Sequence, residues 1–274
     1  MGLSRPVLFT SAVLSLAYPS VVTGQLRPYE PFDWDLLESS RAVSGSFGAA
    51  SLWSQRASLA GTDGHLTELG AFEVFARTGR VVLEVGGTMF RVFEEQDAFA
   101  APTGGAEHLP LGTRRDAGDY RVSTTLLLSD QESASTAILR FGSRLPTTDN
   151  RVGLERDALD FFALVGGRLD RGLLRATAEL GVGIHGTRLP DFEQSDVLIY
   201  ILGLSSRSGQ IRPTLLLLGH ADALEHSIRG NEKLSEIRLR LRGGGRTWIQ
   251  LEGIKGLTQT SPKFGVSLAI GTTR

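Results

Sequence analysis

Apolar and polar residues alternate with a period of two along most of the chain after residue 40. Between residues 174 and 185, for example, one face is apolar throughout: Leu174, Ala176, Ala178, Leu180, Val182 and Ile184. Such alternation is typical of β-strands with one apolar and one polar face, and a helical period fits it poorly. It predicts twelve strands, at roughly 41–53, 64–77, 80–94, 119–128, 134–144, 157–168, 173–185, 196–205, 210–220, 234–242, 247–255 and 263–272.

The connections between these strands alternate in length. The long ones fall at 54–63, 95–118, 145–156, 186–195 and 221–233. The short ones fall at 78–79, 129–133, 169–172, 206–209 and 243–246, and the last, 256–262, is intermediate. Bacterial transmembrane barrels show this asymmetry together with an even number of strands. A strand of about 11 residues, tilted by about 45°, spans the roughly 25 Å apolar band of an outer membrane.

These two patterns together predict an all-β fold, an antiparallel transmembrane β-barrel of about 12 strands with short periplasmic turns and longer outer loops. A secreted β-sandwich, a binding protein with its polar strand faces in solvent, is the alternative. In the barrel, the apolar faces contact lipid. We expect lipid contact for Ala178, Leu180, Val182, Leu217, Leu239, Leu241 and Val266.

The polar strand faces are rich in charge, most of all in segment 234–242. Its candidate lumen-lining residues are Glu236, Arg238, Arg240 and Arg242. Other strands add Arg140, Arg175, Glu179, Arg212 and Glu252. Charges at close quarters in a pore set its field and selectivity, so the arginines predict a preference for anions. Because Arg238 and Arg240 share a face, their repulsion calls for glutamate partners on neighbouring strands. The alternative interpretation is an ordinary solvated sheet face.

The N-terminus has the pattern of a secretory signal peptide over residues 1–24. Arg5 precedes an apolar run from Val7 to Tyr18, and short residues follow up to Gly24. Residues 25–40 do not alternate, and Asp33 could cap a short helix through Leu37. We interpret 25–40 as a periplasmic lead-in or a short plug, and 41–274 as the barrel. After residue 24 no apolar run reaches the length of a transmembrane helix.

Composition and charge narrow the function classes. The chain has 274 residues, 29 Lys+Arg against 30 Asp+Glu, and a net charge of −1, which argues against a nucleic-acid partner. It has no cysteine, so disulfides, thiolate metal sites and cysteine nucleophiles are excluded. Glycine, at 33 residues, disfavours long helices and leaves space on the polar strand faces.

No enzyme motif in the sequence has the surrounding residues that its chemistry requires. Residues 181–186 match GxGxxG, but Pro190 and Asp191 follow where a dinucleotide fold needs a helix. The five histidines lack the spacing of a zinc site, and no GxSxG is present. We therefore expect no enzyme activity, no cofactor and no metal.

Residues 138–167 read ILRFGSRLPTTDNRVGLERDALDFFALVGG. A strand ending in Arg-Leu-Pro-Thr, then Gly-Leu, then an Asp at the start of the next strand, resembles the MetA-pathway of phenol degradation family of outer-membrane barrel transporters. The matching positions are Arg144, Leu145, Pro146, Thr147, Gly153, Leu154 and Asp160. Glu155 replaces the second glycine of the family's Gly-Leu-Gly, and the chain ends in Arg274 rather than the usual terminal aromatic. The resemblance implies a passive channel for small, often apolar molecules.

Two functions are therefore expected for a barrel in the outer membrane of a Gram-negative-type bacterium. The first is a porin-like channel or transporter for a small-molecule solute. The second is a structural or surface-binding barrel with a blocked lumen. Either one would have outer-membrane lipid and the barrel-assembly machinery as partners.

Overall fold

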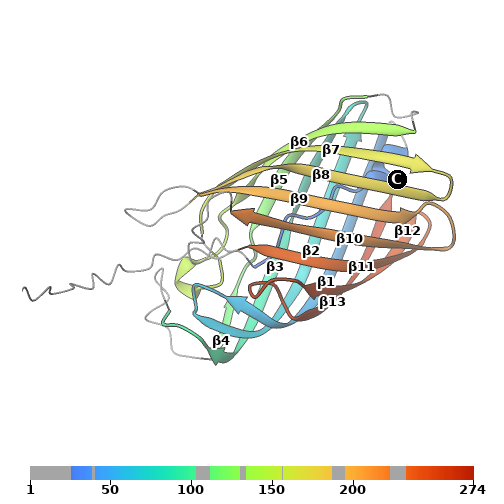
Figure 1. Ribbon diagram of the computed structural model, residues 1–274. Coiled ribbons are helices and arrows are strands. Elements are labelled where there is room, and N and C mark those ends of the chain that lie inside the picture. Colours follow the sequence, from blue (N-terminus) through green and yellow to red (C-terminus); the bar gives the residue numbers. More distant parts are fainter. Residues whose placement is uncertain are drawn as a thin grey trace, which may run out of the picture.

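The computed structural model describes residues 26–38, 41–102, 112–129, 134–155, 157–186, 195–222 and 233–274. The chain forms a closed antiparallel barrel of 12 strands, which confirms the predicted fold class (Figure 1). Each strand pairs with its neighbours in sequence, and β1 closes the barrel by pairing with β13. The first half of the wall consists of β1 (Arg41–Ala57), β2 (Thr62–Thr78), β3 (Val81–Ala98), β5 (Tyr120–Leu127), β6 (Ser135–Leu145) and β7 (Asp160–Arg171). The second half consists of β8 (Leu174–His185), β9 (Ser195–Ser206), β10 (Ile211–Asp222), β11 (Leu234–Gly244), β12 (Thr247–Gly256) and β13 (Phe264–Thr273).

Two details of the first three strands differ from the prediction. The expected long loop at 54–63 is wrong, because β1 and β2 continue and leave only residues 58–61 between them. The β1–β2 register shifts between Leu52 and Gln55, and Ser54 has a φ of 51°. This irregularity interrupts the alternation of apolar and polar residues in the sequence, although β1 and β2 pair again after it. The expected loop 95–118 contains the short strand β4 (Thr113–Asp116), which pairs with the extended end of β3.

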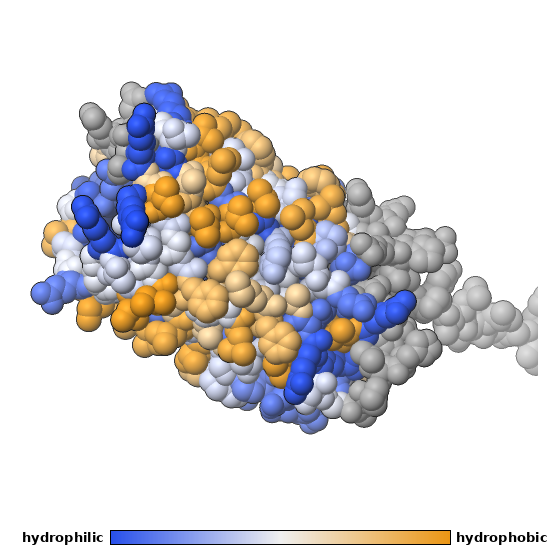
Figure 2. Space-filling view, turned by 180° about the vertical axis from the view of Figure 1, so that it is seen from behind, coloured by the Kyte–Doolittle hydropathy of each residue, from blue (hydrophilic) through white to orange (hydrophobic). Residues whose placement is uncertain are grey.

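On the face shown in Figure 2, apolar side chains gather across the middle of the barrel and hydrophilic side chains lie on either side of them. Of the residues expected to contact lipid, Ala178, Leu180, Val182, Leu239 and Leu241 are exposed, and Leu217 and Val266 are half-buried. Within the described residues, no helix is long and apolar enough to cross a membrane.

Residues 26–38, which we call the N-terminal segment, run through the barrel interior. At one end Leu26 packs with Ala57, Ala60 and Leu154, near the β1–β2 connection. We call this the long-loop end. At the other end Trp34, Leu36 and Leu37 pack with Phe75, Val82, Leu127 and Ile138, close to the tight β2–β3 turn. This is the short-turn end, from which β1 starts and at which β13 finishes (Figure 1).

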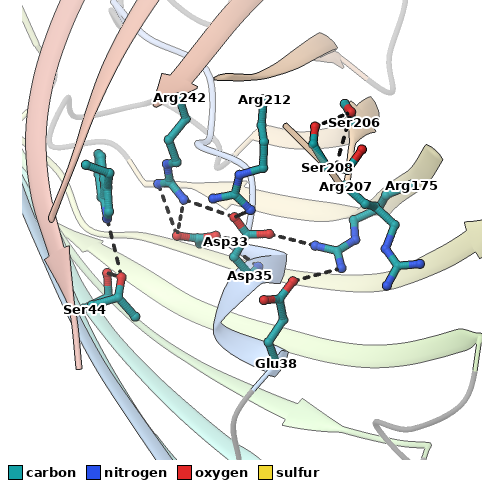
Figure 3. Close-up of polar contacts among 12 residues, drawn as sticks. Asp33, Asp35, Glu38, Ser44, Arg175, Ser206, Arg207, Ser208, Arg212 and Arg242 are labelled. Atoms are coloured by element: carbon teal, nitrogen blue, oxygen red, sulfur yellow. Dashed lines mark hydrogen bonds and ion pairs between the residues drawn. The ribbon is translucent and has the colours of Figure 1, made fainter. Parts of the chain in front are cut away.

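The second half of the N-terminal segment folds into a 3₁₀ helix, η1 (Trp34–Glu38). The Asp33 side chain accepts a hydrogen bond of 3.1 Å from the backbone N–H of Asp35 and so caps the helix. The predicted cap at Asp33 is therefore confirmed. The helix presents Asp33, Asp35 and Glu38 to the inner wall of the barrel (Figure 3).

Candidate channel lumen

The side chains of all the candidate lumen residues lie inside the barrel. Those of Arg140, Arg175, Glu179, Glu236, Arg238 and Glu252 are buried. Those of Arg212, Arg240 and Arg242 are half-buried. Their interior position follows from β geometry, because alternate side chains point to opposite faces of a strand and the other face of each strand is apolar. Their effect on selectivity is not tested by the structure and stays a prediction.

The inner face of β11 carries Glu236, Arg238, Arg240 and Arg242, which we call the charged stripe. This stripe pairs with the neighbouring strand. Glu252 of β12 lies 2.8 Å from the Nε of Arg240 and 3.4 Å from Arg238. Arg238 also lies 2.8 Å from Glu236, two residues earlier on its own strand. The prediction that Arg238 and Arg240 need a glutamate on an adjacent strand is thus confirmed, and the stripe is far less positive than its arginines alone suggest.

The remaining partners of the stripe come from the N-terminal segment. Glu30 lies 2.8 Å from Arg238, and Asp33 lies 3.2 Å from Arg242. Asp35 lies 2.7 Å from Arg175 and 2.8 Å from Arg212 (Figure 3). The N-terminal segment has five charged residues, of which four are acidic (Glu30, Asp33, Asp35, Glu38) and only Arg27 is basic. The net charge of the segment is therefore 1 − 4 = −3. The segment therefore supplies acidic partners for arginines of β8, β10 and β11.

Barrel side chains also bind the backbone of the N-terminal segment. Glu179 accepts a 2.9 Å hydrogen bond from the N–H of Phe32. Arg140 donates to the carbonyl of Glu30 at 2.9 Å, and Arg77 donates to the carbonyl of Leu36 at 2.9 Å. These contacts satisfy polar groups of an extended segment that lacks strand partners of its own. The segment is thus bound along its length by residues from many strands.

A second charged network, which the sequence reasoning missed, occupies β2, β3 and β5. Arg140 lies 2.7 Å from Glu84, and Arg121 bridges Glu84 and Glu73. Glu68 on β2 lies 2.8 Å from Arg91. Glu68 and Glu73 are five residues apart and would face opposite sides of a regular strand. A bulge at Gly70, with a φ of +70°, reverses the alternation and puts both inside.

The loop that carries the family resemblance folds over the long-loop end of the N-terminal segment. Leu154 is buried in the cluster around Leu26, and Arg144 stacks on the Tyr29 ring at 5.0 Å. The carboxylate of Glu155, which departs from the family pattern, binds Arg91 at 2.8 Å and accepts a 3.4 Å hydrogen bond from the N–H of Leu26. The departure therefore adds a partner for the segment.

The other motif residues shape this loop. Leu145 ends β6 and is exposed, and Pro146 follows it. The Thr147 hydroxyl donates to the carbonyl of Gly118 at 2.7 Å. Gly153 has a φ of +77°, a conformation that favours glycine. Asp160 is buried at the start of β7 and accepts a 3.0 Å hydrogen bond from the N–H of Gly186.

Two cavities adjoin the N-terminal segment. The larger, about 170 Å³, lies between the segment and the inner faces of β1, β2 and β13. The smaller, about 70 Å³, lies beside Asp33 and Asp35 and is also lined by Arg175, Arg212 and Arg242. Arg240, Arg242 and Asp33 line both. The described interior therefore contains two spaces beside the segment that share Asp33, Arg240 and Arg242 in their lining.

No family model matches the chain, and no curated protein matches it either, so the resemblance of residues 138–167 to the MetA-pathway family stays a prediction. Solved structures do resemble it. The COG4313 outer membrane channel from Pseudomonas putida F1 has 13% identity and a TM-score of 0.56, with 90% of this chain and 100% of that chain covered.

Two further outer-membrane proteins match less well. The anion-selective porin from Comamonas acidovorans has 10% identity and a TM-score of 0.38, over 85% of this chain and 97% of its own. The translocator domain of the autotransporter NalP from Neisseria meningitidis has 12% identity and a TM-score of 0.37, over 85% and 87%. The likeness to the COG4313 channel shows that this chain has the fold of an outer-membrane barrel channel.

Proposed function

We propose that this protein is a passive outer-membrane channel for small solutes, and that the N-terminal segment is a plug that closes its lumen. The observation that carries the proposal is the path of residues 26–38, which lie inside the barrel and bind arginines of β8, β10 and β11. Export by a signal peptide at residues 1–24, lipid contact by the apolar faces and insertion by the barrel-assembly machinery belong to the same proposal. Residues 1–24 lie outside the described part of the chain.

The chemistry of the wall supports a lumen that opens. A barrel filled only for stability would do as well with apolar residues, because replacing a buried ion pair with apolar side chains is often neutral or stabilising. Here the surface beneath the N-terminal segment carries arginines, glutamates and hydroxyl groups instead. Such a wall hydrates readily once the segment moves, and polar, water-filled interiors are typical of outer-membrane channels.

The charge of the N-terminal segment suggests the class of solute. Since the segment carries a net charge of −3, its departure leaves the wall more positive by three charges. Charges within a narrow pore act strongly on permeating ions. We therefore infer that the open channel favours anions or polar solutes with anionic groups. The apolar cargo implied by the family resemblance fits this wall less well.

Reversal potentials in a salt gradient across a planar bilayer test the proposal. Arg240 is half-buried and lines both cavities. Arg240→Glu should shift the anion-to-cation permeability ratio toward cations by about twofold or more. Arg246→Glu makes the same charge change in the exposed β11–β12 turn and should leave the ratio unchanged. Equal ratios for both variants, with conductance intact, would mean that Arg240 does not line the conducting path.

A structural or surface-binding barrel with a blocked lumen is the second candidate. The many bonds between the N-terminal segment and the wall favour it. Loosening these bonds separates the two functions. A plug that leaves the lumen should give Asp33→Asn/Asp35→Asn a higher open probability in a bilayer than the unaltered protein, whereas a plug that never leaves gives neither protein any conductance. Conductance by the double variant supports the channel, and its absence supports the blocked barrel.

A further inference from the structure

Three arginines from three strands converge on two carboxylates at the short-turn end. We call Arg175 of β8, Arg212 of β10 and Arg242 of β11 the arginine clasp (Figure 3). Arg175 and Arg212 bind the two oxygens of Asp35 at 2.7 and 2.8 Å. Arg242 bridges the two aspartates, with one nitrogen 3.2 Å from Asp33 and 3.4 Å from Asp35. Guanidinium groups so arranged form a strong binding site for carboxylates.

The barrel itself orients two of the three arginines. The Nε of Arg175 lies 2.9 Å from Asp170 of β7. The guanidinium of Arg242 stacks on the Trp248 ring of β12 at 3.9 Å. Neither partner belongs to the N-terminal segment, so both arginines keep a fixed orientation when the segment leaves. A pre-organised site binds a ligand with a smaller loss of side-chain entropy.

The space around the clasp and its accessibility indicate that a solute carboxylate can replace those of Asp33 and Asp35. The 70 Å³ cavity lies directly beside the carboxylates of Asp33 and Asp35, which engage the guanidinium groups of the clasp. The hydroxyl-bearing residues Thr177, Ser205 and Thr214 line it and supply further polar groups. The side chains of Asp35 and Arg212 are each 29% exposed, so a solute reaches them without breaking the wall. A bound solute would have to replace the aspartates.

We propose that the arginine clasp is a binding site for a small dicarboxylate, and that Asp33 and Asp35 occupy it as internal substitutes for that solute. This inference rests on the proposed channel function. Two carboxylates joined by a short carbon chain can meet Arg175 and Arg212 with one end and Arg242 with the other. A monocarboxylate replaces only one aspartate and gains nothing from the second contact.

Displacement of the two aspartates frees the short-turn half of the N-terminal segment. Trp34 lies between them and is buried, packed edge-to-face on Phe32 at a ring separation of 5.3 Å. A solute that takes the clasp shifts the population toward the open lumen by its difference in affinity for the two states. Trp34 then moves into a more polar environment, which makes it a natural reporter.

The test uses the full chain in detergent with succinate as the probe and acetate, at equal ionic strength, as the monocarboxylate. Succinate should shift the Trp34 emission to the red in a saturable way, with the Trp34 signal defined by comparison with Trp34→Phe. Calorimetry should show about tenfold tighter succinate binding to Asp33→Asn/Asp35→Asn, because the internal competitor is gone. Arg212→Gln should weaken binding about tenfold in either background.

A matched control is Asp97→Asn/Asp196→Asn, which removes two acidic charges from exposed positions on β3 and β9. Its affinity for succinate should stay within about twofold of the unaltered protein. Acetate or inorganic phosphate that binds as tightly as succinate would overturn the dicarboxylate assignment. Equal affinities for succinate in Arg212→Gln and the unaltered protein would overturn the clasp as the site.

Bilayer recordings separate this inference from the channel function. If Asp33→Asn/Asp35→Asn conducts but does not bind succinate, the clasp proposal fails and the channel stands. If the variant binds succinate but does not conduct, the channel function fails. Should the double variant not assemble, Arg212→Gln in the otherwise unaltered chain gives the same comparison of succinate affinity.

Discussion

Two sides of the barrel interior treat the N-terminal segment differently. The inner faces of β8, β10 and β11 carry arginines that bind its carboxylates. Those of β1 and β13, together with Ala71 of β2, carry small residues, among them Ser46, Gly48, Ala50, Ser267 and Ala269. Ala71, Gly48 and Ala269 are direct partners across three strands. The cavity of about 170 Å³ lies between this small-residue wall and the charged inner faces that include Arg238, Arg240 and Arg242. The arginines of β8, β10 and β11 thus hold the segment's carboxylates, and small side chains leave space on the side of β1 and β13.

The small-residue wall also depends on a close backbone approach. A Cβ added to Gly48 would fall 2.5 Å from the carbonyl oxygen of Leu268 on β13. Glycine is therefore required there by the pairing of β1 with β13, independently of any solute. The neighbouring alanines are the positions at which cavity volume changes without this clash.

The largest expected effect on stability is at the arginine-bearing inner face of β11. Arg238 is buried against Glu30, Glu236 and Glu252, so Arg238→Met leaves three acids without their central partner. Breaking a buried ion pair should lower the free energy of unfolding by about 3–5 kcal/mol. Urea unfolding in lipid vesicles measures it. Arg246→Met, in the exposed β11–β12 turn, should change it by about 0.5 kcal/mol or less, and equal effects would contradict the comparison.

On the outer surface of the same strand, introducing a charge should destabilise the barrel, whereas on the inner surface removing one does. Leu239 lies between Arg238 and Arg240 on β11 and is 51% exposed on the outside. Leu239→Arg should lower the free energy of unfolding by about 2–4 kcal/mol if it lies near the bilayer midplane. Leu257→Arg, in the connection after β12, serves as the control and should cost about 1 kcal/mol or less. Equal tolerance of both substitutions would contradict lipid contact at Leu239.

The smallest expected effect concerns the small-residue wall. Ala269→Phe should fill the cavity and cut the conductance by about half or more, with little loss of stability, because the ring enters space that is already open. Ala178→Phe adds the same volume on the outer surface and should leave the conductance unchanged. Single-channel recordings compare the two. A normal conductance for Ala269→Phe would mean that solutes pass elsewhere.

Sequence reasoning located the arginines but not what they bind. Alternation alone put Arg175, Arg212 and Arg242 inside the barrel, because side-chain direction along a strand is set by covalent geometry. It also called for a glutamate partner on a neighbouring strand, which the structure shows to be Glu252 of β12, opposite Arg240. It failed at Glu68 and Glu73, where the bulge at Gly70 reverses the faces and leaves no mark in the polar pattern. It also left two alternatives for residues 25–40, a periplasmic lead-in or a plug.

The sequence by itself determined the class of fold, the number of barrel strands and which face of most strands is charged. These properties follow from a local period of two and from the spacing of the turns. Only the tertiary structure decided the path of residues 26–38 and the pairing of their carboxylates. Asp33 and Arg242 are 209 residues apart in sequence, and no local pattern relates them. They meet because a closed barrel brings distant strands around one axis, where the segment's acids satisfy arginines that the strands alone leave short of partners.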